Sequence, residues 1–312
     1  MKVGVDVMGG DFAPYAVIEG AVDALEHFSA EEKIVLLGDE NVLLRKLGEM
    51  NISPSSFIIV PTTQVIEMGD HPAKTFSQKQ NSSIAVGFGM LKNGTLDGFC
   101  SAGNTGAMLV GASYTVNVIP GVFRPALATI LPCIDGRDSV ILDVGLNPDC
   151  KPDVLLQYGI LGSQYAKFVH GKENPTIGLL NIGEEESKGT PAVKTAYEMM
   201  KEHPGLNFTG NVEGHALFHE NMPDVVVCDG FVGNIVLKQA ESIYLITRKI
   251  KVSHPFFERL NFENIGGTPI IGINANVVIG HGISKRKAIM NMIIQTKAVV
   301  AANLAQRIIE AI

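Results

Sequence analysis

The chain has 312 residues, of which 46% are hydrophobic and 18% are charged, and it contains 33 glycines. This length allows one domain or two, and the composition is typical of a folded α/β enzyme and not of a disordered chain. A formal net charge of -7 argues against a nucleic-acid-binding protein, because such a protein needs a basic surface to displace counterions from phosphates.

The N-terminal segment MKVGVDVMGG predicts a first strand, since Asp6 and two glycines break an apolar run too short for a signal peptide. Nowhere do about 18 uncharged apolar residues follow one another, so no transmembrane helix is expected. The cysteines are Cys100, Cys133, Cys150 and Cys228. Because they lack the close pairs of zinc sites and redox dithiols, they predict buried, reduced thiols and a cytoplasmic location.

Along the chain, apolar and β-branched segments alternate with helical ones in the rhythm of βαβ units. Strands are predicted over residues 3–7, 34–37, 57–60, 98–100, 140–144, 176–180, 224–228 and 276–279. Helices are predicted over residues 16–28, 83–91, 105–117, 191–202, 234–247 and 285–309. We therefore expect an α/β fold with a mostly parallel sheet, and a connection over residues 248–267, where the rhythm is broken.

A glycine loop with the sequence SAGNTGA follows the predicted strand at residues 98–100. Its glycines let the backbone turn tightly, and the helix that follows offers free N–H groups and the positive end of its dipole. The candidate phosphate-binding residues are Ser101, Gly103, Asn104, Thr105 and Gly106. The alternative is a tight turn in which Gly106 only provides clearance between helix and strand.

The same spacing recurs after the strand at residues 224–228, where Asp229 and Gly230 are followed by Gly233 and Asn234. Two such loops strengthen the prediction of an anion site at the carboxyl ends of parallel strands. Asn234 is expected at the start of a helix, either as a cap for the first turn or as an amide donor directed into a cleft.

A third loop, NIGEEESKGTP, follows the strand at residues 176–180 and contains Lys188. A lysine beside glycine can supply charge to an anionic substrate, and the glutamates at 184–186 favour its protonated form. The alternative is a solvated loop without a role in chemistry.

The remaining polar loops are less specific. His71 and His281 are candidate acid–base groups, although most single histidines are structural. The basic residues at 285–287 lie in the first turn of a predicted helix, where the helix dipole disfavours positive charge. Either an acidic partner or a solvated face accounts for them. The motifs of nicotinamide, nucleotide-triphosphate and serine-hydrolase sites are missing, and no acidic or histidine cluster has metal spacing, so neither cofactor nor metal is expected.

The segments MGGDFAP, SAGNTGA, LLNIGEEESKG, GNVEG, DGFVGN and GHG occur in this order over nearly the whole chain. This set resembles the bacterial phosphate acyltransferase family of phospholipid synthesis, the acyl-ACP:phosphate acyltransferases (PlsX type). The resemblance implies transfer of a long acyl chain from acyl carrier protein to inorganic phosphate. The product would be an acyl phosphate for the glycerol-phosphate acyltransferase step, and no cofactor would be used.

The resemblance also implies one domain over residues 1–312, in a three-layer α/β/α fold similar to phosphotransacetylase and isocitrate dehydrogenase, and a homodimer. Lys188 and Asn234 match positions with a proposed catalytic role in the family. Lys188 would offset the charge of the nucleophile, and Asn234 would donate to the oxyanion. The other residues expected to bind substrate are those of the loop at 101–106 together with Asp229, Gly230, Gly233 and His281.

One segment departs from the family pattern. Residues 244–267 are shorter and less hydrophobic than the excursion that familiar members use for membrane contact, but they retain basic residues beside Phe256 and Phe257. This predicts at most weak contact with an anionic bilayer, or else a surface for the acidic acyl carrier protein. Two other functions stay open, namely a phosphotransacetylase-like enzyme acting on a short acyl-CoA and a non-catalytic membrane scaffold.

Overall fold

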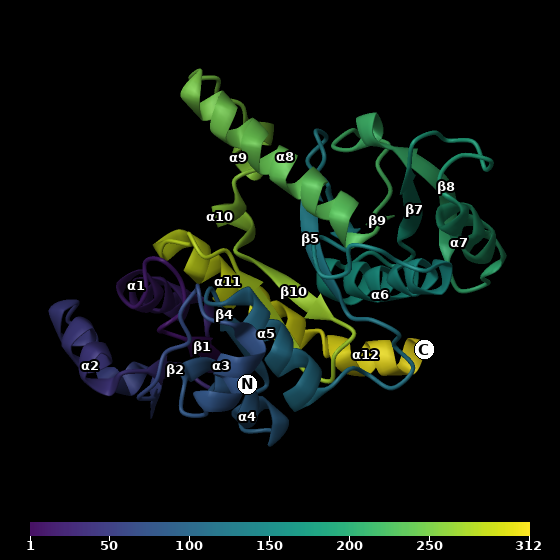
Figure 1. The fold of residues 1–312 in the computed structure, drawn as a ribbon. Coiled ribbons are helices and arrows are strands. Elements are labelled where there is room, and N and C mark those ends of the chain that lie inside the picture. Colours follow the sequence, from purple (N-terminus) through teal and green to yellow (C-terminus); the bar gives the residue numbers. More distant parts are fainter. The chain divides into compact units, whose positions relative to one another are not determined.

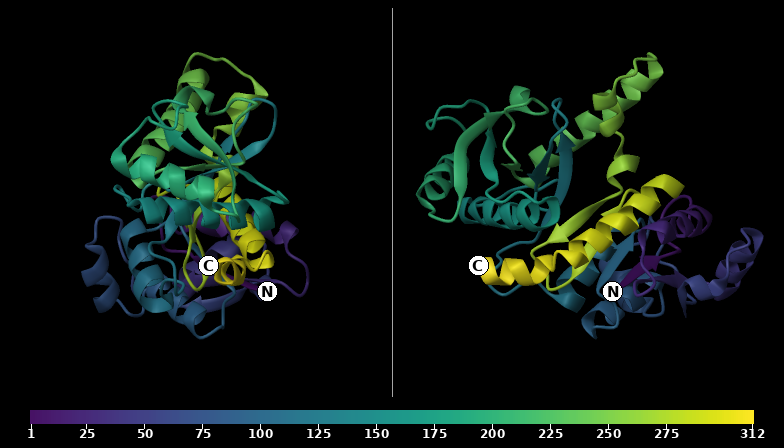
Figure 2. Two further views of the ribbon diagram at one scale, coloured as in Figure 1. Left: turned by 90° about the vertical axis from the view of Figure 1, so that its right-hand side faces the viewer. Right: turned by 180° about the vertical axis from the view of Figure 1, so that it is seen from behind.

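The computed structural model describes residues 1–312. The chain folds into two compact units. Unit 1 contains Met1–Val118 and Glu263–Asn303, and unit 2 contains Ile119–Phe262 and Leu304–Ile312. Figure 1 labels the helices and strands of both units, and Figure 2 shows them from two further sides. Each unit has its own strands and helices and is described by itself.

Unit 1 is built on six strands in the order β3-β2-β1-β4-β11-β10, all parallel except β10, which runs antiparallel to β11. The strands are β1 (Lys2–Asp6), β2 (Lys33–Gly38), β3 (Ile58–Pro61), β4 (Gly98–Ser101), β10 (Gly267–Ile271) and β11 (Asn276–Gly280). The main helices are α1 (Tyr15–Ala24), α2 (Glu40–Glu49), α3 (Pro72–Gln78), α4 (Ser83–Lys92), α5 (Thr105–Gly111) and α11 (Arg286–Ala301).

Helices cover both faces of this sheet because its central strands are apolar on both faces. Val5 of β1 packs into a core cluster with residues of α1 and α11. On the opposite face, Phe99 of β4 packs against α4, where a side chain at Gly87 would collide with the Phe99 ring. The Phe88 and Phe99 rings meet edge to face with centroids 5.5 Å apart. Unit 1 therefore has three layers, with the sheet in the middle.

Unit 2 is built on five strands in the order β5-β6-β9-β7-β8, of which only β5 and β6 are antiparallel neighbours. The strands are β5 (Ala126–Pro132), β6 (Asp138–Leu142), β7 (Thr176–Asn181), β8 (Asn207–Glu213) and β9 (Val225–Val227). Its helices are α6 (Pro152–His170), α7 (Pro191–Glu202), α8 (Gly230–Lys249), α9 (Pro255–Arg259) and α12 (Leu304–Ala311), and α10 (Phe262–Ile265) begins at the boundary with unit 1. Gly162 lets α6 lie directly on β6 and β9, since a Cβ there would come within 2.8 Å of Leu142 and Val225.

The predicted α/β fold with a mostly parallel sheet is confirmed, and all eight predicted strands are present within one or two residues of their expected bounds. Three strands escaped prediction, namely β5, β8 and β10. The first is apolar except for Thr129 and the last contains Pro269, so neither shows alternation. Helix α6 was also missed, because buried residues occupy most of its circumference and blur the 3.6-residue period. The expectation of a single domain over residues 1–312 stays a prediction.

The helix predicted over residues 285–309 is in fact two helices. It breaks at Ala302 and Asn303, where Asn303 has a φ of 51°, and α12 belongs to unit 2.

No single helix of the chain combines the length and the apolar composition needed to cross a bilayer, and α11 with α12 meets that test only as a bent pair. The connection expected at residues 248–267 contains the end of α8 and the short helices α9 and α10, and no strand before Gly267.

We expect Phe88→Ala to lower the free energy of unfolding by about 3–5 kcal/mol, because it removes a fully buried ring that packs on Phe76 and Phe99. Urea denaturation followed by far-ultraviolet circular dichroism measures this change. The matched control is Tyr114→Ala, which truncates a 78% exposed ring of the same unit and should change stability by no more than about 0.5 kcal/mol. Equal losses in the two variants would contradict the assigned core.

Candidate active site

The candidate residues all lie at the carboxyl edges of the two sheets, where parallel strands place their loops. Unit 1 contributes Ser101, Gly103, Asn104, Thr105, Gly106 and His281. Unit 2 contributes Lys188, Asp229, Gly230, Gly233 and Asn234.

In unit 1 a buried carboxylate organises the glycine loop. Asp6 ends β1 and is 1% exposed. Its Oδ2 accepts a hydrogen bond from the Ser101 hydroxyl at 2.6 Å, and Ser101 Oγ in turn accepts from the N–H of Gly103 at 2.9 Å. Burial raises the pKa of the Asp6 carboxyl, while these donors oppose the shift. Ser101 therefore joins β1 to the loop, and its hydroxyl proton is already donated.

In unit 1 the loop after β1 and the loop after β4 come into backbone contact at Gly9 and Gly103. A Cβ at Gly9 would lie 2.7 Å from the backbone nitrogen of Gly103, and a Cβ at Gly103 would lie 3.0 Å from the Cα of Gly9. Any larger residue would push the loops apart. The glycine at position 103 thus has a structural reason as well as the predicted role of letting a ligand approach.

The side chain of Asn104 holds the start of α5. Its Oδ1 accepts from the N–H of Ala107 at 3.0 Å, and its Nδ2 donates to the carbonyl oxygens of residues 67, 68 and 70 at 3.0–3.2 Å. Gly106 faces Pro72 of α3, against which a side chain would collide. What this loop offers a ligand is thus backbone, since the N–H groups of Thr105 and Gly106 have no partner inside the helix.

The two candidate histidines of unit 1 differ in position. His71 is the N-cap of α3, and its Nδ1 accepts from the N–H of Lys74 at 3.5 Å, so its local role is structural. His281 follows β11, and its carbonyl oxygen accepts from the N–H of Ser284 at 2.8 Å. Gly282, its neighbour, accepts from the N–H of Asp11 at 2.8 Å. His281 therefore lies on the loop tied to the segment that follows β1.

Unit 2 repeats this design with Asp143, which follows β6 and is fully buried. Its carboxylate accepts from the N–H groups of Leu127 at 3.0 Å and Asn147 at 2.6 Å. Burial raises its pKa, and these hydrogen bonds oppose the shift. Side chains at Gly230 or Gly233 would collide with Asp143 or its neighbours. The second Gly-x-x-Gly pair thus lets the start of α8 rest on the loop after β6.

The cap of α8 is Asp229, whose carboxylate accepts from the N–H of Val232 at 2.8 Å. The helix was predicted to start at Asn234 but begins at Gly230, so Asn234 is in its second turn and is not the cap. Its exposed side chain lies beside Gly145, where a Cβ would come within 3.6 Å of Asn234 Oδ1. Of the two predicted roles for Asn234, this position leaves that of an amide donor.

Lys188 lies on the exposed loop between β7 and α7. Its N–H donates to the carbonyl oxygen of Glu185 at 3.0 Å, and its Nζ is 4.0 Å from the Glu185 carboxylate, with 48% of the side chain exposed. Glu186 turns away to α7, where the Lys201 ammonium and the Tyr197 hydroxyl hold the pKa of its carboxyl below the usual value. The lysine is therefore accessible and only loosely paired.

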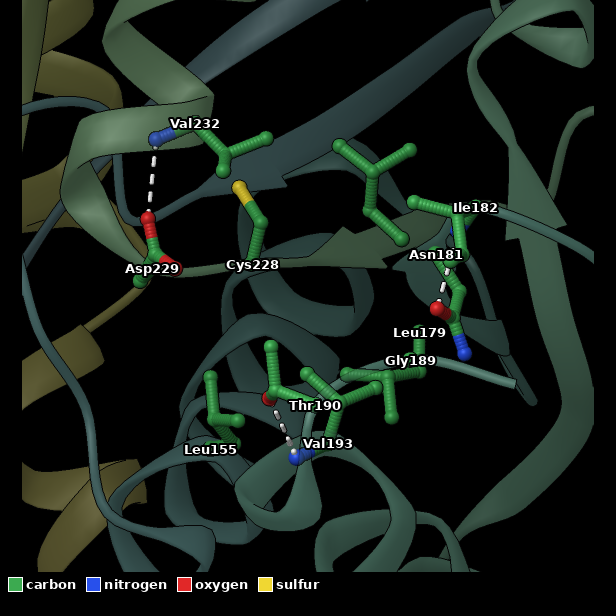
Figure 3. Close-up of a pocket in the computed structure, with 11 residues that line it drawn as sticks. Leu155, Leu179, Asn181, Ile182, Gly189, Thr190, Val193, Cys228, Asp229 and Val232 are labelled. Carbon is green, nitrogen blue, oxygen red and sulfur yellow. Dashed lines mark hydrogen bonds between the residues drawn. The ribbon is translucent and has the colours of Figure 1, made fainter. Parts of the chain in front are cut away.

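A cavity of about 430 Å³ lies between the Lys188 loop and the start of α8. Figure 3 shows Asn181, Ile182 and Gly189 at one part of its wall and Asp229 with Val232 at another. Its lining residues are Leu155, Leu179, Leu180, Asn181, Ile182, Gly189, Thr190, Val193, Cys228, Asp229 and Val232. Unit 2 thus places the loop of Lys188 and the helix of Asn234 around one hollow.

The cysteines are poor nucleophiles in this environment. All four are buried and free of disulfides. Burial raises the pKa of the Cys100 thiol to about 12 and that of Cys150 to about 11, and it raises the pKa of Cys228, which lines the cavity, well above the ordinary value. Since the thiolate is the reactive form, a covalent cysteine intermediate is disfavoured at neutral pH.

Sequence reasoning missed Asp6 and Asp143, which hold the two glycine loops, and it missed Gly145 beside Asn234. A signal was present, because Asp6-Val7 and Asp143-Val144 both end apolar strands and are both followed closely by glycine. The cavity lining gave no comparable signal. Its aliphatic residues come from four separate segments, none of which stands out in the sequence.

Comparison with known proteins identifies a family and close relatives of this chain. Residues 1–254 match the model of a family described as "Fatty acid synthesis protein". The chain is 39% identical over 296 residues to a phosphate acyltransferase of Syntrophomonas wolfei, covering 93% of this chain and 92% of the relative. It is 42% identical over 317 residues to a phosphate acyltransferase of Caldicellulosiruptor bescii, covering 96% and 94%.

Among solved structures, a phosphotransacetylase from Streptococcus pyogenes has a similar fold. Its TM-score is 0.68 at 16% sequence identity, over 96% of this chain and 94% of that one. At this identity the likeness concerns the fold alone. It agrees with the phosphotransacetylase-like α/β fold expected from the sequence.

We expect Asp6→Asn to change how stability depends on pH. Because folding raises the pKa of this carboxyl above its ordinary value of 3.8, the folded state binds the proton more tightly than the unfolded state. The contribution of Asp6 is therefore most favourable below that ordinary value and is lost as the pH rises through the raised pKa. The unfolding free energy of the wild type should therefore fall relative to that of Asp6→Asn as the pH rises. Urea denaturation across this range measures the shift, and a difference independent of pH would contradict it.

Proposed function

The chain belongs to the phosphate acyltransferase family and is a transferase, and from that premise we propose that it moves a long-chain fatty acyl group from acyl carrier protein to inorganic phosphate. The observation that carries this proposal is the cavity of unit 2, which lies between the loop of Lys188 and the start of the helix that bears Asn234. The loop that carries the charged donor and the helix that carries the amide donor thus both border a hollow of a size typical of small-molecule sites.

In the proposed reaction an oxygen of hydrogen phosphate attacks the carbonyl carbon of the acyl thioester. A C–O bond forms, the C–S bond breaks, and the proton of hydrogen phosphate passes to the departing thiolate. The products are an acyl phosphate and the free thiol of acyl carrier protein. Phosphate is already anionic near neutral pH, so no covalent enzyme intermediate is needed, in agreement with the raised pKa of the Cys228 thiol.

Each candidate loop has a role in this proposal. The backbone N–H groups at the start of α5, around Thr105 and Gly106, bind phosphate oxygens. Asn104 and Ser101 keep that loop in shape through the hydrogen bonds described above. His281, Asp229, Gly230 and Gly233 complete the substrate-binding set as sequence reasoning placed them.

The two catalytic residues act on developing charge. Lys188 is accessible and only loosely paired with Glu185, so its ammonium can approach an anion without breaking a strong ion pair. Asn234 has an exposed amide held beside Gly145. We propose that Lys188 neutralises the attacking phosphate and that Asn234 donates to the oxyanion of the tetrahedral intermediate.

We further propose a cytoplasmic homodimer with weak peripheral membrane contact, whose product is consumed by a glycerol-phosphate acyltransferase. The four free, buried cysteines support a reducing compartment. Helix α8 supports a partner surface, because Leu245 and Ile246 on it are 65% and 55% exposed. The basic residues at its end, Arg248 and Lys249, lie beside the exposed Ile250 and support contact with an anionic bilayer.

The decisive experiment is incubation of the purified chain with phosphate and either palmitoyl-ACP or acetyl-CoA, with release of thiol measured over time. We expect phosphate-dependent thiol release from palmitoyl-ACP and formation of palmitoyl phosphate. Turnover of acetyl-CoA alone would instead identify a short-chain phosphotransacylase. Intact palmitoyl-ACP together with binding to liposomes would identify a non-catalytic scaffold.

Lys188→Ala and Asn234→Ala should lower the turnover number strongly without loss of folding, because both side chains are exposed on the surface of unit 2. For Asn234, loss of an oxyanion donor should cost about 100- to 1,000-fold. The matched controls are Lys194→Ala on α7 and Gln239→Ala on α8, which are also exposed and should keep the wild-type rate. A wild-type rate in a folded Lys188 or Asn234 variant would remove that residue from the mechanism.

A further inference from the structure

We propose that the cavity of unit 2 binds the hydrocarbon tail of the acyl group and that Val193 sets the longest chain it accepts. This inference rests on the proposed function and adds to it the place of the tail and the basis of chain-length selection. The cavity measures about 430 Å³, within the range of about 300–1,000 Å³ typical of small-molecule sites.

The lining is predominantly aliphatic. Leu155 of α6 and Leu179 of β7 are buried, at 3% and 0% exposure, and form the inner wall with the partly buried Val193 of α7. Ile182 and Val232 lie at the rim, where they are 81% and 37% exposed. Apolar side chains therefore run from solvent to the inner wall, and burying a tail along them removes both the tail and the exposed rim from water.

The polar side chains of the lining already have partners. Asn181 donates to the carbonyl oxygen of Lys188 at 3.2 Å and accepts from the N–H of Ile182 at 2.8 Å. Thr190 Oγ1 accepts from the N–H of Val193 at 3.3 Å, and the Cys228 thiol contacts the carbonyl oxygen of Asp143 at 3.5 Å. These contacts need no ligand group to satisfy them, and a hydrocarbon would leave them intact.

Charge in the lining argues against an anion. The one ionisable carboxylate there is Asp229, which caps α8, and no lysine or arginine contributes to the wall. Phosphate in this cavity would face a carboxylate and aliphatic groups without a cation to offset its charge. An uncharged, apolar occupant fits this lining, and the fatty tail is the apolar part of the proposed donor.

The position of the cavity relates this tail site to the chemistry. Gly189 and Thr190 of the wall directly follow Lys188 in the loop. Val232 of the wall and Asn234 are two residues apart on α8 and therefore point to different sides of that helix. A tail bound inside would therefore leave its thioester end near the rim, next to the loop that carries Lys188. Neither Lys188 nor Asn234 lines the cavity itself, so its walls can be changed without removing either one.

The test compares wild type with Val193→Phe, which fills the cavity, using palmitoyl-ACP and octanoyl-ACP as donors. Each methylene that is buried favours binding about fourfold, so we expect kcat/KM for palmitoyl-ACP to fall roughly tenfold or more relative to octanoyl-ACP. The matched control is Thr195→Phe, an exposed position on the same helix, which should leave that ratio unchanged. An unchanged ratio in a folded Val193→Phe enzyme would overturn the proposal.

A binding measurement separates this inference from the proposed function. Because the native cysteines are buried, Ile182→Cys provides one exposed thiol at the rim for an environment-sensitive fluorophore. Titration with palmitate should give a saturable fluorescence change that Val193→Phe weakens and that acetate does not produce. Saturable palmitate binding without turnover of any thioester would overturn the proposed function and retain the tail site. Turnover without a palmitate response would overturn the tail site and retain the function.

Discussion

The architecture of each unit depends on one buried carboxylate at the carboxyl end of a strand. Asp6 accepts hydrogen bonds from Ser101 and from the segment after β1. Asp143 accepts from the backbone N–H of Leu127 on β5 and from that of Asn147 in its own loop. Each carboxylate is satisfied by several donors, which compensates for much of the cost of removing its charge from water. The loops around them are thereby fixed, and glycines at 9, 103, 230 and 233 are required because these loops approach at backbone distance.

The residues that hold the loops in place are therefore different from the residues proposed to take part in the reaction. Asn104 looked like a ligand-binding side chain, but its amide is fully used in capping α5 and tying down the segment at 67–70. Lys188 and Asn234, by contrast, are exposed and have few partners. Rigid backbone donors in unit 1 and accessible side chains in unit 2 suit the proposed reaction, in which the nucleophile brings its own charge and the protein supplies orientation and electrostatic stabilisation.

The cavity adds an apolar element that the glycine loops lack. Its aliphatic walls and its single carboxylate make it unsuitable for phosphate, so under the proposed function the tail and the phosphate would bind at different places. The Cys228 thiol in its wall is kept protonated by burial and contributes as a small apolar group. An enzyme that joins a fatty tail to phosphate needs both kinds of surface.

The sequence by itself determined the α/β class, the eight strands with strong apolar runs and the glycine loops at their ends, because these depend on local periodicity and on residues with special backbone freedom. It also marked Lys188 and Asn234, through motifs long enough to indicate a family. Only the tertiary structure decided that Asp229 and not Asn234 caps α8, that Gly103 is needed where two loops cross, and that Asp6 and Asp143 are buried. It alone assembled the cavity, since Leu155, Leu179, Val193 and Val232 come from separate elements. Each of these side chains is an ordinary aliphatic residue in its own segment, and a shared hollow exists only after packing brings them together.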